Sequence, residues 1–120
     1  MKKITLLGID IAKEIFQLHG TDNQGNAILK KKLRRKELLE FIANTPTCTI
    51  AMEACGGSHY WAREFKKLGH TAKLISPQFV KPFVKGNKTD SNDAEAIATA
   101  ARQPNMGRNA HALGNAQCNL

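Results

Sequence analysis

Cysteine is scarce and long apolar runs are missing in this chain of 120 residues. Its three cysteines, Cys48, Cys55 and Cys118, are odd in number and show no Cys-x-x-Cys spacing, which argues against both a disulfide framework and a four-thiolate zinc site. A membrane-spanning helix needs about 20 consecutive apolar residues, whereas the apolar residues here fall in short periodic segments. We therefore expect a protein that is neither stapled by disulfides nor embedded in a membrane.

The amino terminus also lacks the pattern of a signal peptide. Met-Lys-Lys and residues 4–7 give a basic start and an apolar stretch, but Gly8, Asp10 and Lys13 interrupt that stretch too early. We therefore expect a cytoplasmic location.

Acidic residues are scarce. Ten Asp and Glu stand against 18 Lys and Arg, which gives a formal net charge of +8 and a pI near 9.7. A balance this basic indicates an anionic partner, and nucleic acid is the commonest one for a protein of this kind. At 13.2 kDa the chain has room for one modest domain.

The hydrophobic pattern predicts an α/β domain that opens with three strands. Residues 4–9 are almost continuously apolar, as in a strand buried on both faces, and a turn-rich segment over 21–26 joins the next two strands into an antiparallel hairpin. Helices then alternate with two further strands. The expected strands cover 4–9, 15–19, 27–33, 47–53 and 71–75; the expected helices cover 35–44, 58–68 with Ser58 as N-cap, a turn or two after Ser76-Pro77, and 90–102.

Four of the ten acids fall where such a fold can bring them together. Asp10 and Glu53 end two predicted strands, and functional groups of open α/β sheets gather beyond the carboxyl ends of strands. Asp90 and Asp93 are three residues apart at the start of a helix and share one face. Because like charges repel, a fold gathers acids mainly where a cation or a shared proton holds them. All-oxygen ligands favour Mg²⁺, and two such ions can stabilise both oxygens of a phosphoryl displacement.

Each acid also has a structural interpretation. Asp10 can be a turn residue, and Asp90 with Asp93 matches a helix N-cap and its N3 partner. Glu53 is harder to explain in this way, because it lies in an apolar neighbourhood where an ionised carboxylate is costly without a partner. Together the four acids favour a metal site.

Two groups of cations are candidates for contacts with phosphates. The first lies in the basic run over 30–36 and includes Lys31, Arg34 and Arg35, although a solvated strand-to-helix corner explains it about as well. The second, Lys81, Lys85 and Lys88, leads into the acidic pair. By their helical spacing, Trp61, Phe65 and Leu68 are interpreted as core rather than as base-stacking residues.

Four segments carry a resemblance to a known family. They are Gly-Ile-Asp-Ile-Ala-Lys at 8–13, Met-Glu-Ala-Cys-Gly-Gly-Ser-His-Tyr-Trp at 52–61, Leu-Gly-His at 68–70, and the run from Ile75 to Ile97 that contains Lys-Thr-Asp-Ser-Asn-Asp-Ala-Glu. From about residue 4 to Met106 the chain closely resembles the amino-terminal domain of the DEDD transposases, insertion-sequence recombinases related to the pilin-gene invertases.

The resemblance implies a ribonuclease-H-like fold, a mixed α/β sheet flanked by helices and closest to the Holliday-junction resolvase RuvC. It implies that Asp10, Glu53, Asp90 and Asp93 are the catalytic tetrad that binds Mg²⁺ or Mn²⁺, and that the protein acts on DNA in transposition. It also implies a structured guide RNA and assembly of several copies of the chain.

In that family a carboxyl-terminal domain carries a serine that attacks DNA, and this chain ends before any such domain. We therefore expect a catalytic domain over 1–106, a poorly ordered tail outside the family pattern over 107–120, and no complete strand exchange by this chain alone.

Two other interpretations remain open. One is a catalytically inert fragment that binds nucleic acid or dimerises. The other is an actin-like or sugar-kinase-like ATPase half, since those folds also begin with a Gly-Ile-Asp strand and a hairpin. The second has less support, because no second glycine-rich phosphate loop is visible.

Overall fold

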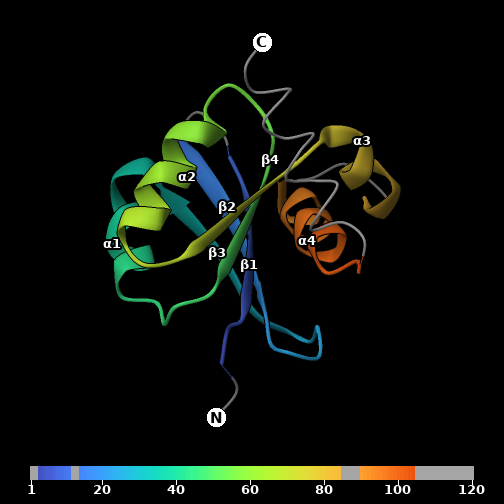
Figure 1. Ribbon diagram of the computed structural model, residues 1–120, viewed down its shortest axis with the longest axis horizontal. Helices are drawn as coiled ribbons and strands as arrows, with labels where there is room; N and C mark the ends of the chain where they lie inside the picture. The colour runs from blue at the N-terminus through green and yellow to red at the C-terminus, as the bar shows by residue number, and fades with distance from the viewer. Residues whose placement is uncertain (1–2, 12–13, 85–89, 105–120) are drawn as a thin grey trace.

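A computed structural model describes residues 3–11, 14–84 and 90–104, with side chains in the last range from Asp93 onward. A five-stranded sheet forms its centre, with helices on both faces (Figure 1). The strands are β1 (Leu6–Asp10), β2 (Ile15–Thr21), β3 (Ala27–Arg34), β4 (Thr49–Glu53) and β5 (Thr71–Ile75). The helices are α1 (Arg35–Ala43), α2 (Ser58–Lys67), α3 (Pro77–Val80), the 3₁₀ turn η1 (Lys81–Phe83) and α4 (Asp90–Ala101).

The sheet is mixed, with the strand order β3-β2-β1-β4-β5. β1 pairs antiparallel with β2 and parallel with β4, and β4 pairs parallel with β5. The predicted hairpin is confirmed by the antiparallel pairing of β2 with β3, and its turn is held by Asp22 Oδ1, which accepts the backbone N–H groups of Gln24 and Asn26 at 2.9 Å each. The central strand β1 is buried along almost its whole length, as its continuous apolar sequence predicts.

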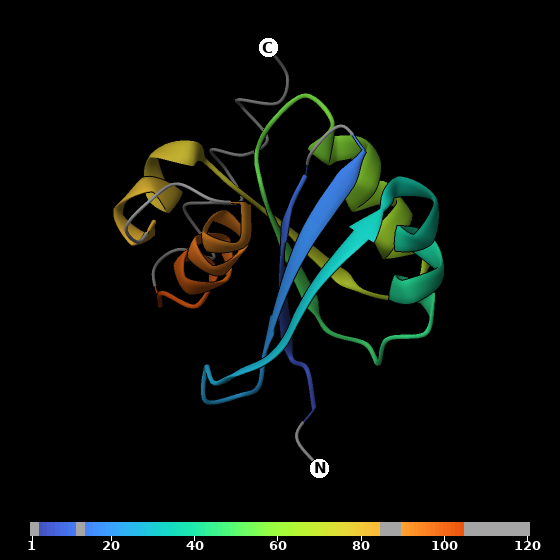
Figure 2. The same cartoon turned by 180° about the vertical axis from the view of Figure 1, so that it is seen from behind.

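Each face of the sheet has its own core. α1 and α2 cover one face, where Phe16, Ile50 and Phe65 are fully buried. α3, η1 and α4 cover the other face, where Ala51, Ile75 and Ile97 are buried (Figure 2). No helix within the described ranges is both long and apolar enough to cross a membrane.

The aromatic residues of α2 behave mostly as predicted. Trp61 is only 3% exposed and lies edge-on to Phe16 with ring centroids 5.2 Å apart, which confirms its place in the core. The prediction for Leu68 is wrong, because this side chain is 39% exposed. Leu68 is the C-cap of α2, and Gly69 then turns the chain with a φ of 95° that other residues rarely adopt, so the helical stripe ends before Leu68.

Two of the predicted caps differ in their outcome. The N-cap of α3 is Ser76 with Pro77 at the first helical position, as expected, although no hydrogen bond from the Ser76 side chain caps the helix. The N-cap of α2 is Gly57, so the prediction of Ser58 is wrong by one residue. Ser58 instead holds the preceding turn, since its hydroxyl accepts the Cys55 N–H at 3.0 Å and donates to the Cys55 carbonyl at 2.8 Å.

A buried histidine fastens the start of β4 to α1. His70 Nδ1 accepts the backbone N–H of Cys48 at 3.2 Å, so the ring hydrogen lies on Nε2, which donates to the Ile42 carbonyl at 2.9 Å. The ring therefore supplies a hydrogen-bond acceptor for the buried N–H of Cys48, which lies just before the first residue of β4.

Replacing His70 with Ala is expected to lower the free energy of unfolding by about 2–4 kcal/mol, because the buried Cys48 N–H loses its acceptor and a cavity remains. His70→Asn, whose side-chain oxygen can reproduce the Nδ1 acceptor, is expected to lose clearly less. Urea denaturation measures both variants. Equal stability of His70→Ala and the parent would contradict the role given to this ring.

Burial raises the pKa of the Cys48 thiol from its ordinary value of 9.0 to about 11. The pKa of this thiol is higher in the folded protein than in the unfolded chain. The contribution of the neutral thiol to folding stability is therefore fully present below about pH 9 and is lost as the pH rises towards 11. The stability difference between the parent and Cys48→Ala is therefore expected to shrink by about 2–3 kcal/mol over this range, as measured by urea denaturation at pH 8 and pH 11. A difference that does not change with pH would show that the thiol ionises normally.

Candidate active site

Asp10 and Glu53 end neighbouring strands at the same level of the sheet. The parallel register pairs Leu6 with Thr49 and continues to Ile9 opposite Met52. One further step along both strands brings Asp10 opposite Glu53, where neighbouring strands are about 4.8 Å apart. The parallel pairing of β1 with β4 therefore places these two acids on adjacent strands.

Both acids also leave the sheet on the same face. Side chains alternate along a strand, so Asp10 shares a face with Leu6 and Gly8, and Glu53 shares one with Ala51. Leu6 and Ala51 both belong to the core beneath α4. The two carboxylates, each partly buried, therefore project on the α4 side of the sheet.

Gly8 lets α4 lie directly on β1. A Cβ atom added to Gly8 would be 2.6 Å from the carbonyl oxygen of Ala94 and 2.9 Å from the backbone nitrogen of Ala98. Distances this short leave no room for any side chain between the helix backbone and the strand. Gly8 therefore sets how closely the helix approaches β1.

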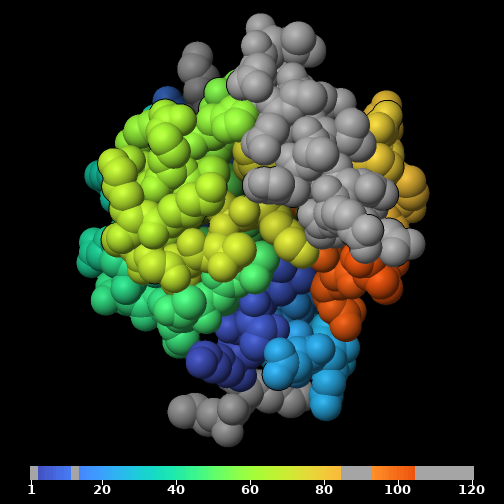
Figure 3. Space-filling model, viewed as in Figure 1, coloured from blue at the N-terminus to red at the C-terminus, as the bar shows by residue number. Residues whose placement is uncertain are grey.

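The direction of α4 follows from its other end. The Arg102 guanidinium, just beyond the helix, lies against Gly25 in the turn between β2 and β3. That turn follows Thr21, which pairs with Leu6 at the beginning of β1, and Figure 3 shows the end of α4 in orange beside this turn in light blue. The amino-terminal end of α4 therefore points towards the carboxyl end of β1.

This direction brings the first turn of α4 to the level of Asp10. From Ala94 back to Asp90 the helix rises about 6 Å, and from Gly8 to Asp10 the strand rises about 6.6 Å. Asp93, partly buried, lies in that first turn, and the side chain of Asp90 lies outside the described residues. Within the described part of the chain, no three His, Cys, Asp or Glu residues form a group that could hold a metal ion. The four-acid ligand set therefore stays a prediction.

The predicted cations divide between the two sides of the sheet. Lys81 is exposed at the start of η1, beside α4, whereas Lys85 and Lys88 lie outside the described residues. Lys31, Arg34 and Arg35 are exposed on β3 and at the start of α1. The Lys31 ammonium lies 5.2 Å from the centre of the Phe41 ring, and the Arg35 guanidinium lies 5.1 Å from the centre of the Trp61 ring.

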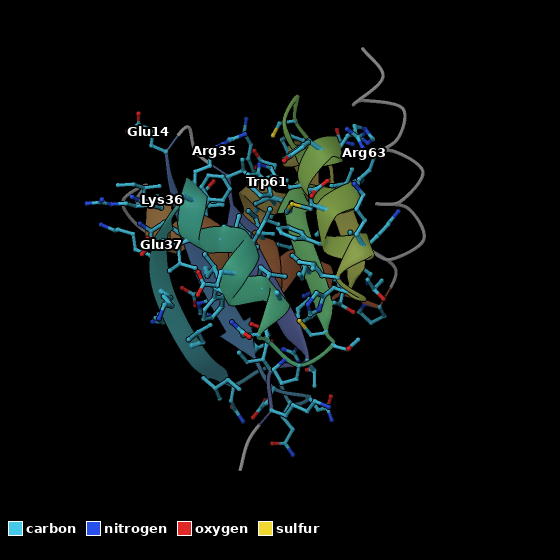
Figure 4. The ribbon with its side chains drawn as sticks, turned by 90° about the vertical axis from the view of Figure 1, so that its left-hand side faces the viewer. Glu14, Arg35, Lys36, Glu37, Trp61 and Arg63 are labelled. Atoms are coloured by element: carbon cyan, nitrogen blue, oxygen red, sulfur yellow. The ribbon has the colours of Figure 1, made fainter. Side chains whose placement is uncertain are left out.

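A groove of about 680 Å³ opens at the same end of the sheet, on the α1 and α2 side. Arg34, Arg35, Lys36 and Glu14 supply its charged groups, and Ile15, Leu39, Tyr60 and Trp61 supply its apolar surface. Figure 4 shows Glu14, Arg35 and Lys36 on one side of this face and Arg63 on the opposite side, with Trp61 between them.

Tyr60 is the residue that sequence reasoning missed in this groove. Its side chain is 43% exposed, and its ring lies edge-on to Trp61 with centroids 5.1 Å apart. Trp61 and Phe65 are four residues apart and share the buried stripe of α2, whereas Tyr60 is one position off that stripe. This offset was the signal in the sequence that could have identified it.

The family model DEDD_Tnp_IS110, described as Transposase, matches residues 7–117. The chain is 50% identical over 103 residues to a probable family 20 transposase of Pseudomonas aeruginosa, covering 86% of this chain and 30% of that protein. It is also 50% identical over 106 residues to the transposase of insertion sequence element IS1328 of Yersinia enterocolitica, covering 88% of this chain and 32% of that protein. The chain thus spans about a third of the length of these relatives.

Among solved structures, T. thermophilus RuvC in complex with a Holliday junction substrate matches with a TM-score of 0.55 and 14% sequence identity. The match covers 81% of this chain and 91% of that one. It confirms the expected ribonuclease-H-like fold with a mixed sheet and flanking helices.

Gly8→Ala is expected to lower the free energy of unfolding by about 1–3 kcal/mol, because the new methyl group meets the backbone of α4 and cannot be relieved by moving a side chain. The matched control is Gly56→Ala, since a Cβ there would meet nothing within 4 Å. Guanidinium denaturation measures both. A Gly8→Ala variant as stable as the control would mean that α4 does not approach β1 this closely.

Proposed function

Because the chain belongs to the DEDD transposase family and corresponds to its amino-terminal RuvC-like domain, we propose that it carries out divalent-metal-dependent phosphoryl transfer on DNA during transposition. The observation that supports this most is the pairing of β1 with β4, which leaves two carboxylates side by side at one end of the sheet, under the first turn of α4. Because the chain belongs to this family, we no longer retain the actin-like ATPase interpretation.

The residues at this end of the sheet fit a hard divalent cation. Asp10 and Glu53 offer oxygen ligands on adjacent strands, and Asp90 with Asp93 would complete the set from α4. Their proposed partner is Mg²⁺ or Mn²⁺. Bound there, the ion would supply charge stabilisation for the oxygens of the phosphate being attacked.

The protein's own contribution is to hold these carboxylates rigidly. Asp10 and Glu53 lie in paired strands, and directly after Glu53 the Ala54 N–H donates to the Ile75 carbonyl at 2.7 Å. The Ser58 hydroxyl then fastens the turn at Cys55, so this hydroxyl is occupied in holding the loop. Lys81, Lys85 and Lys88 are proposed to neutralise phosphates of the DNA strand entering from the α4 side.

The remaining functions of the relatives would come from elsewhere. We propose that residues 1–106 form the catalytic domain, that 107–120 lie outside it, and that a serine-bearing domain is needed for complete strand exchange. We further propose that the protein works with a structured guide RNA and assembles with further copies of the chain. Its proposed location is the cytoplasm, where bacterial DNA lies.

A second candidate is a fragment that binds nucleic acid without performing chemistry. The observation that favours it is that Asp10, Glu53 and Asp93, all within the described residues, do not by themselves form a metal-holding group. The two candidates differ in whether the acids bind metal and whether DNA is cut.

Metal binding is tested by following thermal unfolding with and without Mn²⁺. A concentration 100 times the dissociation constant is expected to stabilise the parent by about 2.7 kcal/mol. Asp10→Asn and Glu53→Gln are expected to lose this stabilisation. In metal-free buffer each variant should be at least as stable as the parent, because one of two repelling charges is gone.

The control for these variants is Glu40→Gln, since Glu40 is an exposed acid on α1 and on the opposite side of the sheet from α4. It should respond to Mn²⁺ like the parent. A parent that Mn²⁺ does not stabilise would refute the metal site.

Catalysis is tested separately by nicking of supercoiled DNA in Mn²⁺. We expect the parent and Glu40→Gln to nick at the same rate and Asp10→Asn to be slower by at least a hundredfold, or about 2.7 kcal/mol. Metal binding without nicking would favour the binding fragment, and nicking that survives in Asp10→Asn would point to a contaminating nuclease.

A further inference from the structure

The groove between α1 and α2, defined above by its eight lining residues, has no part in the proposed metal chemistry. It opens at the same end of the sheet as Asp10 and Glu53, but on the other face. We propose that this groove binds an unpaired nucleotide of the DNA strand next to the phosphate that is cut, with the base stacked on Tyr60 and the backbone phosphate held by Arg34 and Lys36.

The charge of the groove favours a polyanion. Three cations line it, Arg34, Arg35 and Lys36, against the single carboxylate of Glu14. The nearby Glu37 is not one of the lining residues; its Oε1 accepts the backbone N–H of Arg34 at 2.9 Å, and its carboxylate keeps its negative charge. The lining therefore carries two more cations than carboxylates, and still one more when Glu37 is counted, which favours an acidic occupant.

The apolar surface of the groove favours a flat aromatic group. Trp61 forms a rigid, buried floor, since it lies edge-on to Phe16 and stacks on Phe65 with centroids 5.9 Å apart. The Arg35 guanidinium already lies over the Trp61 ring. Tyr60 and Ile15, each 43% exposed, are the apolar side chains left open to an incoming ring.

An exposed aromatic ring beside several cations is the combination that proteins use for single-stranded nucleic acid. Bases within a duplex have both faces covered by their neighbours, so only an unpaired base can stack on Tyr60. A volume of about 680 Å³ falls within the range of ligand sites that take a molecule of nucleotide size.

The position of the groove favours DNA. Only three residues lie between Asp10 and Glu14, so the Cα atoms of these two residues are at most about 14 Å apart. A strand held at the acids and passing over the end of the sheet would reach the groove within a few nucleotides. This inference rests on the proposed function, because DNA is the substrate proposed there.

The test is equilibrium binding of a 12-nucleotide oligo(dT) in buffer that contains EDTA, so that failure of the metal site does not affect the result. Trp61 is the single tryptophan of the chain, and its fluorescence should fall as the oligonucleotide binds beside it. Tyr60→Ala is expected to weaken binding about tenfold or more, because it removes one stacked base. Tyr60→Phe, which keeps the ring, should bind within about twofold of the parent.

Three control variants distinguish binding in the groove from non-specific attraction to the basic surface. Leu68→Ala removes a similarly exposed apolar side chain from the end of α2 and should leave binding unchanged. Arg34→Ala should reduce the slope of log affinity against log salt by about 0.7, as expected for one lost phosphate contact on a single strand. Arg63→Ala removes an exposed arginine of the same helix as Tyr60, outside the groove, and should leave the slope unchanged.

Three outcomes would overturn the proposal. The first is equal affinity of Tyr60→Ala and Tyr60→Phe, with both folded as judged by circular dichroism. The second is binding of double-stranded DNA with the same dependence on Tyr60. The third is dependence on Tyr60 with oligo(U) RNA but not with oligo(dT), which would assign the groove to an RNA strand.

Discussion

The contact of α4 with β1 at Gly8 is the constraint on which the rest of the arrangement depends. Because a side chain at this position would collide with backbone atoms of Ala94 and Ala98, the helix can lie on the sheet only while residue 8 has no Cβ. This contact fixes the distance of the helix from the strand, and the contact of Arg102 with the hairpin turn fixes its direction. Together they bring acids from opposite ends of the chain to one end of the sheet.

The fold was predictable because local signals agreed with the final structure. The apolar segments, Gly25 in the hairpin turn and the proline after Ser76 each indicate one local conformation, and the observed strands and helices begin and end close to the expected residues. The sequence pattern indicated helical crossovers between strands, but the adjacency of β1 and β4 is given by the structure. The burial of Trp61 followed from its spacing with Phe65.

What sequence reasoning could not supply depends on tertiary geometry. The exposure of Tyr60 and Leu68 differs from that of Trp61 because small rotations around a helix decide which side chains reach the core. The role of Gly8 is visible only when the opposing helix is in place. Ser58 looked like an N-cap because hydroxyl residues favour that position, yet its hydroxyl bonds the turn before the helix. For Asp90 the decisive fact is the orientation of its side chain, which no pattern in the sequence determines.

The close approach of α4 to β1 also has a consequence for the order in which the protein is made. β1, β2 and β3 are neighbours along the chain and can pair as they leave the ribosome. The contact of Gly8 with α4, in contrast, cannot form until Ala94, near the other end of the described residues, has been synthesised. Until that helix has been synthesised, the apolar surface of Leu6, Ala51 and Ile75 remains uncovered. The nascent chain therefore exposes one face of its sheet to water, and to other chains, until α4 has been synthesised.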